Sequence, residues 1–184
     1  RQAMARGEDL PDHTTGAALF ADISGFTSLA RVFVAELGPQ RGAEALLGVI
    51  NPVYEALITP LHRYGGSVLS FAGDAITCWL DARDGPAAPR AVRAALAMQA
   101  AMTEFAEVQT PDGTPIALSV KIAISAGPAR RFLVGDPAIM QLDTLAGATL
   151  ARMTAAEHHA ERGEVVVSAE VVDALQDTIQ VAAW

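Results

Sequence analysis

Two aspartates stand where apolar stretches of the sequence end. Asp22 follows the run 17–21, whereas Asp74 follows Gly73 between two further apolar stretches. If these stretches are neighbouring strands, both carboxylates lie at one end of a sheet. Such a pair can hold hard divalent cations, and two ions there can activate a hydroxyl group and neutralise a triphosphate. Alternatively, Asp22 starts a helix and Asp74 is an ordinary turn residue, and spacing alone leaves both interpretations open.

The segment after Asp22 has the character of a phosphate-binding turn. It contains Gly25, and Ser24 or Thr27 is expected to cap a helix that begins there. The first N–H groups of a helix lack intrahelical acceptors and carry a partial positive charge, so they attract anions. We therefore expect this turn to face phosphate groups.

The elements that would carry these residues alternate along the chain. Apolar or alternating runs predict strands over 17–21, 67–72, 75–80, 116–126, 142–146 and 164–168. Helical spacing predicts helices after Gly25 and over 43–62, 91–108, 148–159 and 169–175. Pro52 is expected to kink or interrupt the second of these helices.

The turn at Gly73 and Asp74 indicates how these elements are arranged. It joins two strands as a hairpin, which makes the sheet at least partly antiparallel. This favours an α+β sandwich over a doubly wound parallel sheet. Residues 127–147 are expected to be irregular or to form a hairpin. Residues 1–16 are expected to form an N-terminal arm, and residues 17–184 the folded domain.

Composition excludes several classes of protein. The 184 residues are 51% apolar, and 13 basic against 21 acidic residues give a formal net charge of −8, which argues against nucleic-acid binding. No uncharged apolar run is long enough for a membrane span, and the N-terminal stretch does not resemble a signal peptide. Cys78 is the single cysteine, so we expect no internal disulfide and a cytoplasmic location.

Two stretches of the sequence resemble the metal motifs of class III adenylyl and guanylyl cyclases. FADISGFTSLA at 20–30 resembles the first motif, and YGGSVLSFAGDAITCWL at 64–80 resembles the second. VKIAISAGPA at 120–129 is similar to the central strand that follows in these proteins. GATLARMTAAE at 147–157 resembles their dimerisation-side helix, and RGEVVVS at 162–168 the strand after it.

This resemblance extends over nearly the whole chain. The sequence of these motifs is most similar to that of the first cyclase domain in the soluble, bicarbonate-responsive adenylyl cyclase subgroup. The segments SFAGDAI and VKIAISAG carry most of this similarity. The resemblance implies a ferredoxin-like palm sandwich, in which a mostly antiparallel sheet is flanked by helices. It also implies a signalling lyase that acts as a dimer.

The resemblance also implies roles for individual residues. Asp22 and Asp74 match the catalytic, metal-binding aspartates for two Mg²⁺ or Mn²⁺ ions, and Ile23 matches the residue whose carbonyl oxygen also contacts metal. Lys121, the only lysine, matches a basic position that contacts the triphosphate, unless it is an ordinary solvent-facing lysine. Thr144 matches a base-contacting position. The phosphate-binding set would be Ile23, Ser24, Gly25, Phe26, Thr27 and Lys121.

Three positions depart from the family pattern. The lysine that recognises the base is replaced by Ser70, and the asparagine and arginine that act in the transition state are replaced by Ala151 and Ala155. Alanine offers neither a donor nor a charge to the transferring phosphoryl group. Arg152, one turn from the lost arginine, is a possible substitute. The chain therefore has the metal and phosphate half of a site without its other half.

These observations favour a cyclase half that converts ATP to cyclic AMP and pyrophosphate together with a second cyclase-type domain, in a homodimer or heterodimer. We expect the isolated chain to be inactive or very weak. A degenerate domain with a regulatory or dimerisation role is the alternative. The motif sequences match another two-metal palm enzyme, such as a diguanylate-forming domain, less well. The sequence does not decide whether the substrate is ATP or GTP.

Overall fold

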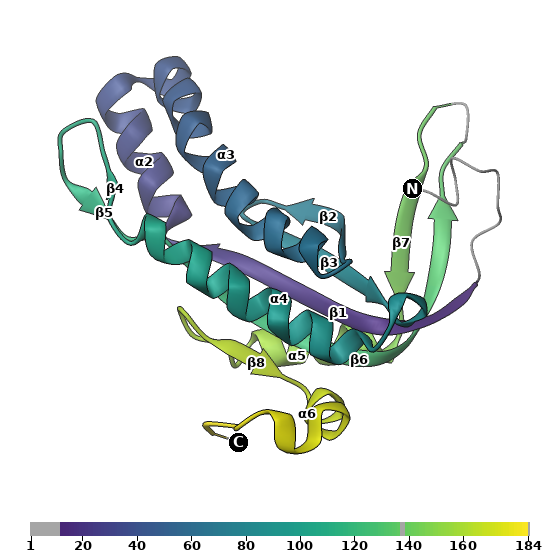
Figure 1. Cartoon of the computed structure of the whole chain (residues 1–184). Helices are drawn as coiled ribbons and strands as arrows, with labels where there is room; N and C mark the ends of the chain where they lie inside the picture. The colour runs from purple at the N-terminus through teal and green to yellow at the C-terminus, as the bar shows by residue number, and fades with distance from the viewer. Residues whose placement is uncertain (1–11, 137–138, 184) are drawn as a thin grey trace.

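One sheet organises the chain in the computed structural model, which describes residues 12–136 and 139–183 (Figure 1). Six strands take the order β2-β3-β1-β6-β7, with β8 also paired to β6. All pairs are antiparallel except β6 with β8. The strands are β1 (His13–Ser24), β2 (Ser67–Ala72), β3 (Ala75–Asp81), β6 (Ser119–Val134), β7 (Leu142–Ala146) and β8 (Val165–Val167). A separate small sheet pairs β4 (Val108–Gln109) with β5 (Pro115–Ile116).

Helices cover both faces of the main sheet. They are α2 (Phe26–Leu37), α3 (Pro39–Arg63), α4 (Ala87–Met102), α5 (Ala148–Glu157) and α6 (Ala169–Leu175). Buried residues of α3, α4 and α6 share one apolar cluster with β1, β3 and β6. Met153 and Ala156 of α5 belong to a second cluster, on the opposite side of the sheet. This arrangement confirms the expected α+β fold with a mostly antiparallel sheet.

Side chains of the central strand β1 alternate between the two clusters. Leu19, Ala21 and Ile23 belong to the cluster beneath α3 and α4, whereas Ala18 belongs to the cluster beneath α5. Since successive side chains of a strand point to opposite faces, Asp22 lies on the same face as Ala18. The strand begins at His13, so residues 13–16, which we expected in the N-terminal arm, are already part of the sheet.

The helix after β1 is not capped as expected. Neither Ser24 nor Thr27 caps α2; the N-cap is Gly25, and no side-chain cap is present. Gly25 has a φ of +97°, and a Cβ there would lie 2.5 Å from the carbonyl oxygen of Ala117. Glycine is therefore required at this turn, and the first N–H groups of α2 keep no side-chain acceptor.

Pro52 does not interrupt its helix, which rules out one of the two effects expected of it, a kink or an interruption. The helix α3 runs unbroken from Pro39 to Arg63 and contains Pro52 within it. The carbonyl group that loses its partner belongs to Gly48, which is exposed, so water can bind that carbonyl. The buried residues Val53 and Leu57 hold the helix against the sheet.

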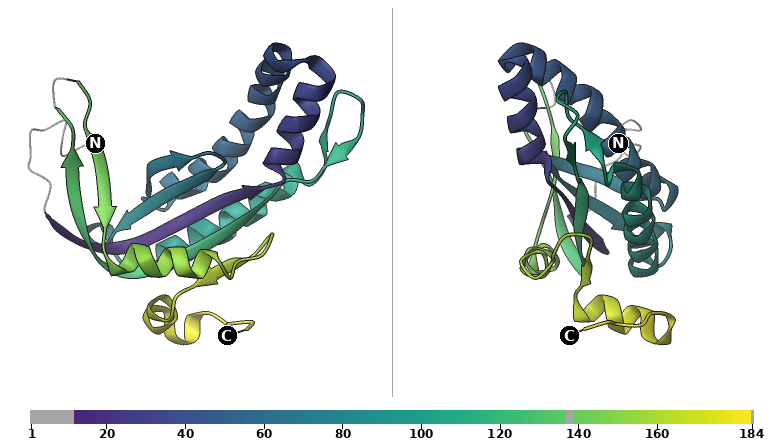
Figure 2. Two further views of the ribbon diagram at one scale, coloured as in Figure 1. Left: turned by 180° about the vertical axis from the view of Figure 1, so that it is seen from behind. Right: turned by 90° about the vertical axis from the view of Figure 1, so that its left-hand side faces the viewer.

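Two parts of the chain project from opposite ends of the sheet (Figure 2). The helical pair α2 and α3 rises at one end, and the hairpin of β6 and β7 rises at the other. This hairpin confirms the expectation of a hairpin within residues 127–147, although β6 continues to Val134. None of the helices in the described part of the chain is long and apolar enough to cross a membrane.

Gly16 fixes how closely β1 and β3 approach, and we predict that Gly16→Ala destabilises the fold. A Cβ there would overlap the Leu80 carbonyl oxygen and lie 2.5 Å from the Trp79 ring. We expect a loss of about 2–3 kcal/mol in the free energy of unfolding, measured by urea denaturation. The control is Gly48→Ala, which meets no atom within 4 Å and should stabilise α3 by about 1 kcal/mol. Equal stability of Gly16→Ala and the wild type would show that this close approach does not require glycine.

Candidate active site

The register of three strands gathers the predicted site residues at one end of the sheet. Asp22 lies opposite Ala75 of β3 on one side and opposite Lys121 of β6 on the other. Because Asp74 directly precedes Ala75, its turn adjoins the end of β1. The backbone N–H of Ile23 donates a hydrogen bond of 3.3 Å to the carbonyl oxygen of Asp74. The hairpin and β1 are thus joined at the point where both aspartates lie.

Lys121 makes an ionic network within this group. Its Nζ lies 3.4 Å from Asp22 Oδ2 and also donates a hydrogen bond to Glu157 Oε1 of α5. The three side chains are largely shielded, with exposed fractions of 23% for Lys121, 26% for Asp22 and 19% for Glu157. The hydrogen bond to Glu157 is the main cause that raises the pKa of Lys121; burial opposes it, and Asp22 adds to it. The ammonium group therefore stays charged at neutral pH.

The turn between β1 and α2 lies beside the same carboxylates. Ile23 and Ser24 end β1, Gly25 turns the chain, and Phe26 and Thr27 begin α2. The first helical bond runs from the N–H of Leu29 to the carbonyl of Gly25, at 3.1 Å. The N–H groups of the preceding helical residues have no acceptor within the helix, which makes this end of α2 electropositive.

Two carboxylates and the backbone around Ile23 offer oxygen ligands of the kind that hard divalent cations prefer. The side chains of Asp22 and Asp74 are both partly buried. A cationic group already lies at Asp22 in the form of the Lys121 ammonium. In the described part of the chain, no cluster of three or more histidine, cysteine or acidic side chains forms a ready metal cage. Any ion bound here would need further ligands from a bound molecule or water.

Thr144, the residue predicted to contact a base, is not part of this group. It lies on β7 opposite Phe132, eleven residues along β6 from Lys121. At about 3.3 Å per residue, this separation is roughly 35 Å along the strand. Ser70 lies on β2, and Ala151 and Ala155 lie on α5; all three are exposed. One chain therefore does not bring Thr144 to its own aspartates.

Arg152 does not take the place of the missing arginine. Its Nη2 donates to the carbonyl of Ala126 at 3.2 Å, and its Nε lies 2.8 Å from Glu170 Oε1. These contacts hold the guanidinium group at the junction of α5, β6 and α6. The idea that Arg152 substitutes for the lost donor finds no support in this position.

Two residues next to the site could not be identified from the sequence. Glu157 ends the segment 147–157, but nothing in its helical spacing indicates that it pairs with Lys121 of β6. Tyr54 lies in α3 and donates a hydrogen bond of 3.0 Å to the carbonyl of Gly73, beside Asp74. Both contacts are long-range, and only the packing of the helices on the sheet creates them.

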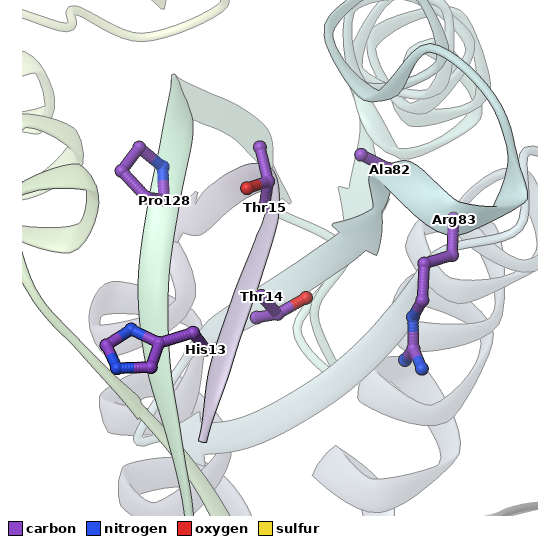
Figure 3. A pocket seen from close by; sticks show the side chains of 6 residues that line it. All are labelled: His13, Thr14, Thr15, Ala82, Arg83 and Pro128. Carbon is purple, nitrogen blue, oxygen red and sulfur yellow. The ribbon is translucent and has the colours of Figure 1, made fainter. Parts of the chain in front are cut away.

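A hollow of about 540 Å³ lies at the other end of β1, lined by His13, Thr14, Thr15, Ala82, Arg83 and Pro128 (Figure 3). Arg83 is held by Asp81, with Nε and Nη2 at 3.0 and 2.9 Å from its two carboxylate oxygens. Burial raises the pKa of Asp81, but hydrogen bonds from Arg83 and Thr14 outweigh it and lower the pKa overall. None of the predicted site residues lines this hollow, so it is separate from the aspartate site.

Comparison with known proteins gives a family match over almost the whole chain. The family model of the adenylate and guanylate cyclase catalytic domain matches residues 10–183. Adenylate cyclase type 10 of Oryctolagus cuniculus and of Homo sapiens are each 38% identical over 65 residues. That segment is 35% of this chain and only 4% of each relative. These matches confirm the resemblance drawn from the motifs.

Solved structures share the fold. The guanylyl cyclase Cya2 superimposes with a TM-score of 0.76 and 24% identity, covering 94% of this chain and 83% of that chain. The adenylyl cyclase CyaB of P. aeruginosa gives a TM-score of 0.72 and 22% identity, covering 91% and 83% respectively. The palm sandwich expected from the motifs is therefore confirmed.

The side-chain NMR signal of Lys121 can be observed without overlap, because the sequence contains no other lysine. In chain labelled with ¹³C,¹⁵N-lysine, we predict one side-chain NMR signal whose titration midpoint lies above the ordinary value of 10.5. Glu157→Gln should lower that midpoint, because it removes the main cause of the shift. Folding raises this pKa. The network therefore contributes its full stabilisation at pH values below the pKa of an unfolded lysine. This stabilisation is lost as the pH rises through the folded pKa.

The matched control is Glu55→Gln, which removes an exposed glutamate from α3. It should leave the midpoint of Lys121 where it is in the wild type. Circular dichroism at each pH checks that the chain remains folded. An unchanged midpoint in Glu157→Gln would show that the ionic network does not exist in solution.

Proposed function

Because the chain belongs to the adenylate and guanylate cyclase catalytic domain family, we propose that it supplies the metal- and triphosphate-binding half of a nucleotide cyclase. A second cyclase-type domain supplies base recognition and the transition-state donors, and together they convert ATP to cyclic AMP and pyrophosphate. The observation that carries the proposal is the strand register that joins Asp22, the Asp74 turn and Lys121 at one end of the sheet.

The donors at this end suit Mg²⁺ or Mn²⁺. Asp22 and Asp74 provide carboxylates, and Ile23 provides a backbone carbonyl next to Asp22. When bound, two divalent ions would lower the pKa of the ribose 3′-hydroxyl and offset the charge of the triphosphate. The residues of the chain hold the ions and orient the phosphates.

Phosphate binding is assigned to Lys121 and the turn 23–27. The ammonium group of Lys121 acts as a compact point charge toward phosphate oxygens. Ser24 and Gly25 bring the chain into α2, and Phe26 and Thr27 present backbone N–H groups at its electropositive end. The network with Glu157 keeps Lys121 on the face of the sheet where the triphosphate would lie.

The missing donors explain why a partner domain is needed. A serine at position 70 and alanines at 151 and 155 leave the chain without the groups that read the base and stabilise the transferring phosphoryl group. Thr144, proposed as a base contact, lies far along the hairpin from the aspartates of its own chain. Such a residue can serve only a site that two domains share.

The β6–β7 hairpin has a surface suited to pairing with that domain. Its exposed apolar side chains are Phe132, Leu133, Val134, Ile139, Met140 and Leu142. Many exposed apolar side chains on one projecting element are typical of a protein interface. Pairing through this hairpin would bring Thr144 toward the aspartates of the partner.

A degenerate domain with a regulatory or dimerisation role is the second candidate. Exposed alanines at 151 and 155 fit that role equally well. The intact group of Asp22, Asp74 and Lys121 favours the catalytic proposal, because a purely structural module has no need of it. Whether the nucleotide is ATP or GTP depends mostly on the partner.

A complementation assay tests the proposal. We expect this chain alone to form cyclic AMP from Mn²⁺-ATP at least about 10³-fold more slowly than an intact cyclase, the loss associated with a missing transition-state arginine. Mixing it with a cyclase domain that keeps the base lysine and the transition-state asparagine and arginine, but lacks its own metal aspartates, should produce activity. Asp74→Ala in this chain should abolish that activity.

The outcome separates the two candidates when pairing is measured alongside activity. Activity that appears only in the mixture and depends on Asp74 supports the catalytic half. Demonstrated pairing without any activity would favour the degenerate module. Turnover by the chain alone within tenfold of an intact cyclase would overturn the proposal of a half site.

Restoring the missing groups provides an independent prediction. The triple variant Ser70→Lys, Ala151→Asn and Ala155→Arg places longer side chains at exposed positions, so the fold should accept them. We expect its homodimer to gain activity of about 10³-fold over the wild type. The same variant with Asp74→Ala should stay inactive. A folded, dimeric triple variant without activity would show that the metal half is itself defective.

A further inference from the structure

We propose that Tyr54 is a positioning residue that anchors the Gly73–Asp74 turn to α3 and so sets Asp74 beside Asp22. The proposal rests on the function proposed above, since the exact place of Asp74 matters for chemistry only if it binds a metal. Nothing in the metal motifs themselves contains this residue, because it lies about twenty residues before Asp74 in the chain.

The hydroxyl group of Tyr54 provides the first contact. It donates a hydrogen bond of 3.0 Å to the carbonyl oxygen of Gly73. The next carbonyl along the turn, that of Asp74, accepts from the N–H of Ile23 at 3.3 Å. Two successive carbonyls of the turn are therefore held by two different elements, α3 and β1.

The turn has little packing of its own. Gly73 is exposed with a φ of +64°, and a Cβ built there would meet no atom within 4 Å. A turn with so little packing at Gly73 would otherwise move on a fast timescale. A hydrogen bond from a rigid helix restricts that motion directly at the residue before Asp74.

The ring of Tyr54 provides a second contact with the same hairpin. It packs edge-on against Phe71 of β2, with ring centroids 5.4 Å apart and planes at 85°. Phe71 remains 58% exposed despite this contact, so Tyr54 is one of few neighbours that give its ring a defined place. The strand that leads into the turn and the turn itself are thus held by one side chain.

The rest of α3 makes Tyr54 a rigid support. Its neighbours Val53 and Leu57 are fully buried in the core beneath the helix. Burial and the nearby charge of Asp74 both raise the pKa of Tyr54, in that order, so the hydroxyl remains a donor at neutral pH.

The test is Tyr54→Phe, which removes one oxygen atom and keeps the ring contact with Phe71. Two measurements apply to the purified chain. In the metal-free protein, ¹⁵N relaxation should show lower order parameters for the amides of Gly73 and Asp74. Mn²⁺ binding, followed by electron paramagnetic resonance of the free ion, should weaken about three- to tenfold, the effect expected for one neutral hydrogen bond.

Tyr64→Phe is the matched control. Tyr64 is the other tyrosine, lies at the end of α3, and has its backbone carbonyl bonded to Arg90. It should leave both measurements at their wild-type values. A purely structural role for Tyr54 would lower the melting temperature without a selective change at Gly73 and Asp74.

The outcomes distinguish this inference from the proposed function. If Asp74→Ala abolishes Mn²⁺ binding but Tyr54→Phe binds as tightly as the wild type, the positioning role is wrong. Unchanged order parameters at the turn in Tyr54→Phe would also overturn it. If the wild type binds no Mn²⁺, or Asp74→Ala binds it equally well, the metal site itself fails, and the relaxation data alone decide whether Tyr54 anchors the turn.

Discussion

The hydrogen-bond register of β1 determines where every charge of the site lies. This strand is paired on both sides, which sets Asp22 between Ala75 and Lys121. A slip of one residue would exchange the two faces and move Asp22 into the apolar layer beneath α3 and α4. Leu19 and Ala21 are fully buried on that layer, so such a slip would remove them from it and bury a charge in their place. The packing of the core therefore fixes the geometry of the polar end.

The electrostatics of the site follow from this constraint. Lys121 pairs with both Asp22 and Glu157 in a partly shielded position, where the interactions of charges are stronger than in open water. Among residues 12–136 and 139–183, no ion pair involves Asp74, whose place is set through the backbone of its turn. The site thus carries three carboxylates, those of Asp22, Asp74 and Glu157, against one ammonium, and this excess of negative charge favours the approach of a further cation.

The local parts of the fold could be predicted from the sequence, and the long-range parts could not. The hairpin around Gly73 and Asp74 and the short strand β7 follow from turn residues and apolar runs. The uninterrupted course of α3 through Pro52 could not be predicted, because burial of its apolar face outweighs the local cost of proline. The contacts of Lys121 with Glu157 and of Tyr54 with Gly73 join elements distant in sequence. No spacing rule relates such residues without the three-dimensional packing.

The two halves of the predicted site place different demands on the fold. Ala151 and Ala155 lie on the exposed side of α5, where alanine is the best helix former, so the loss of larger polar groups costs the structure nothing. Asp22 is partly shielded beside a buried core and needs Lys121 to offset its charge. Stability alone would favour neutral residues there. The aspartate group therefore has a cost in folding free energy, whereas alanines at 151 and 155 have none. This contrast is consistent with the proposal that a partner domain supplies the missing groups.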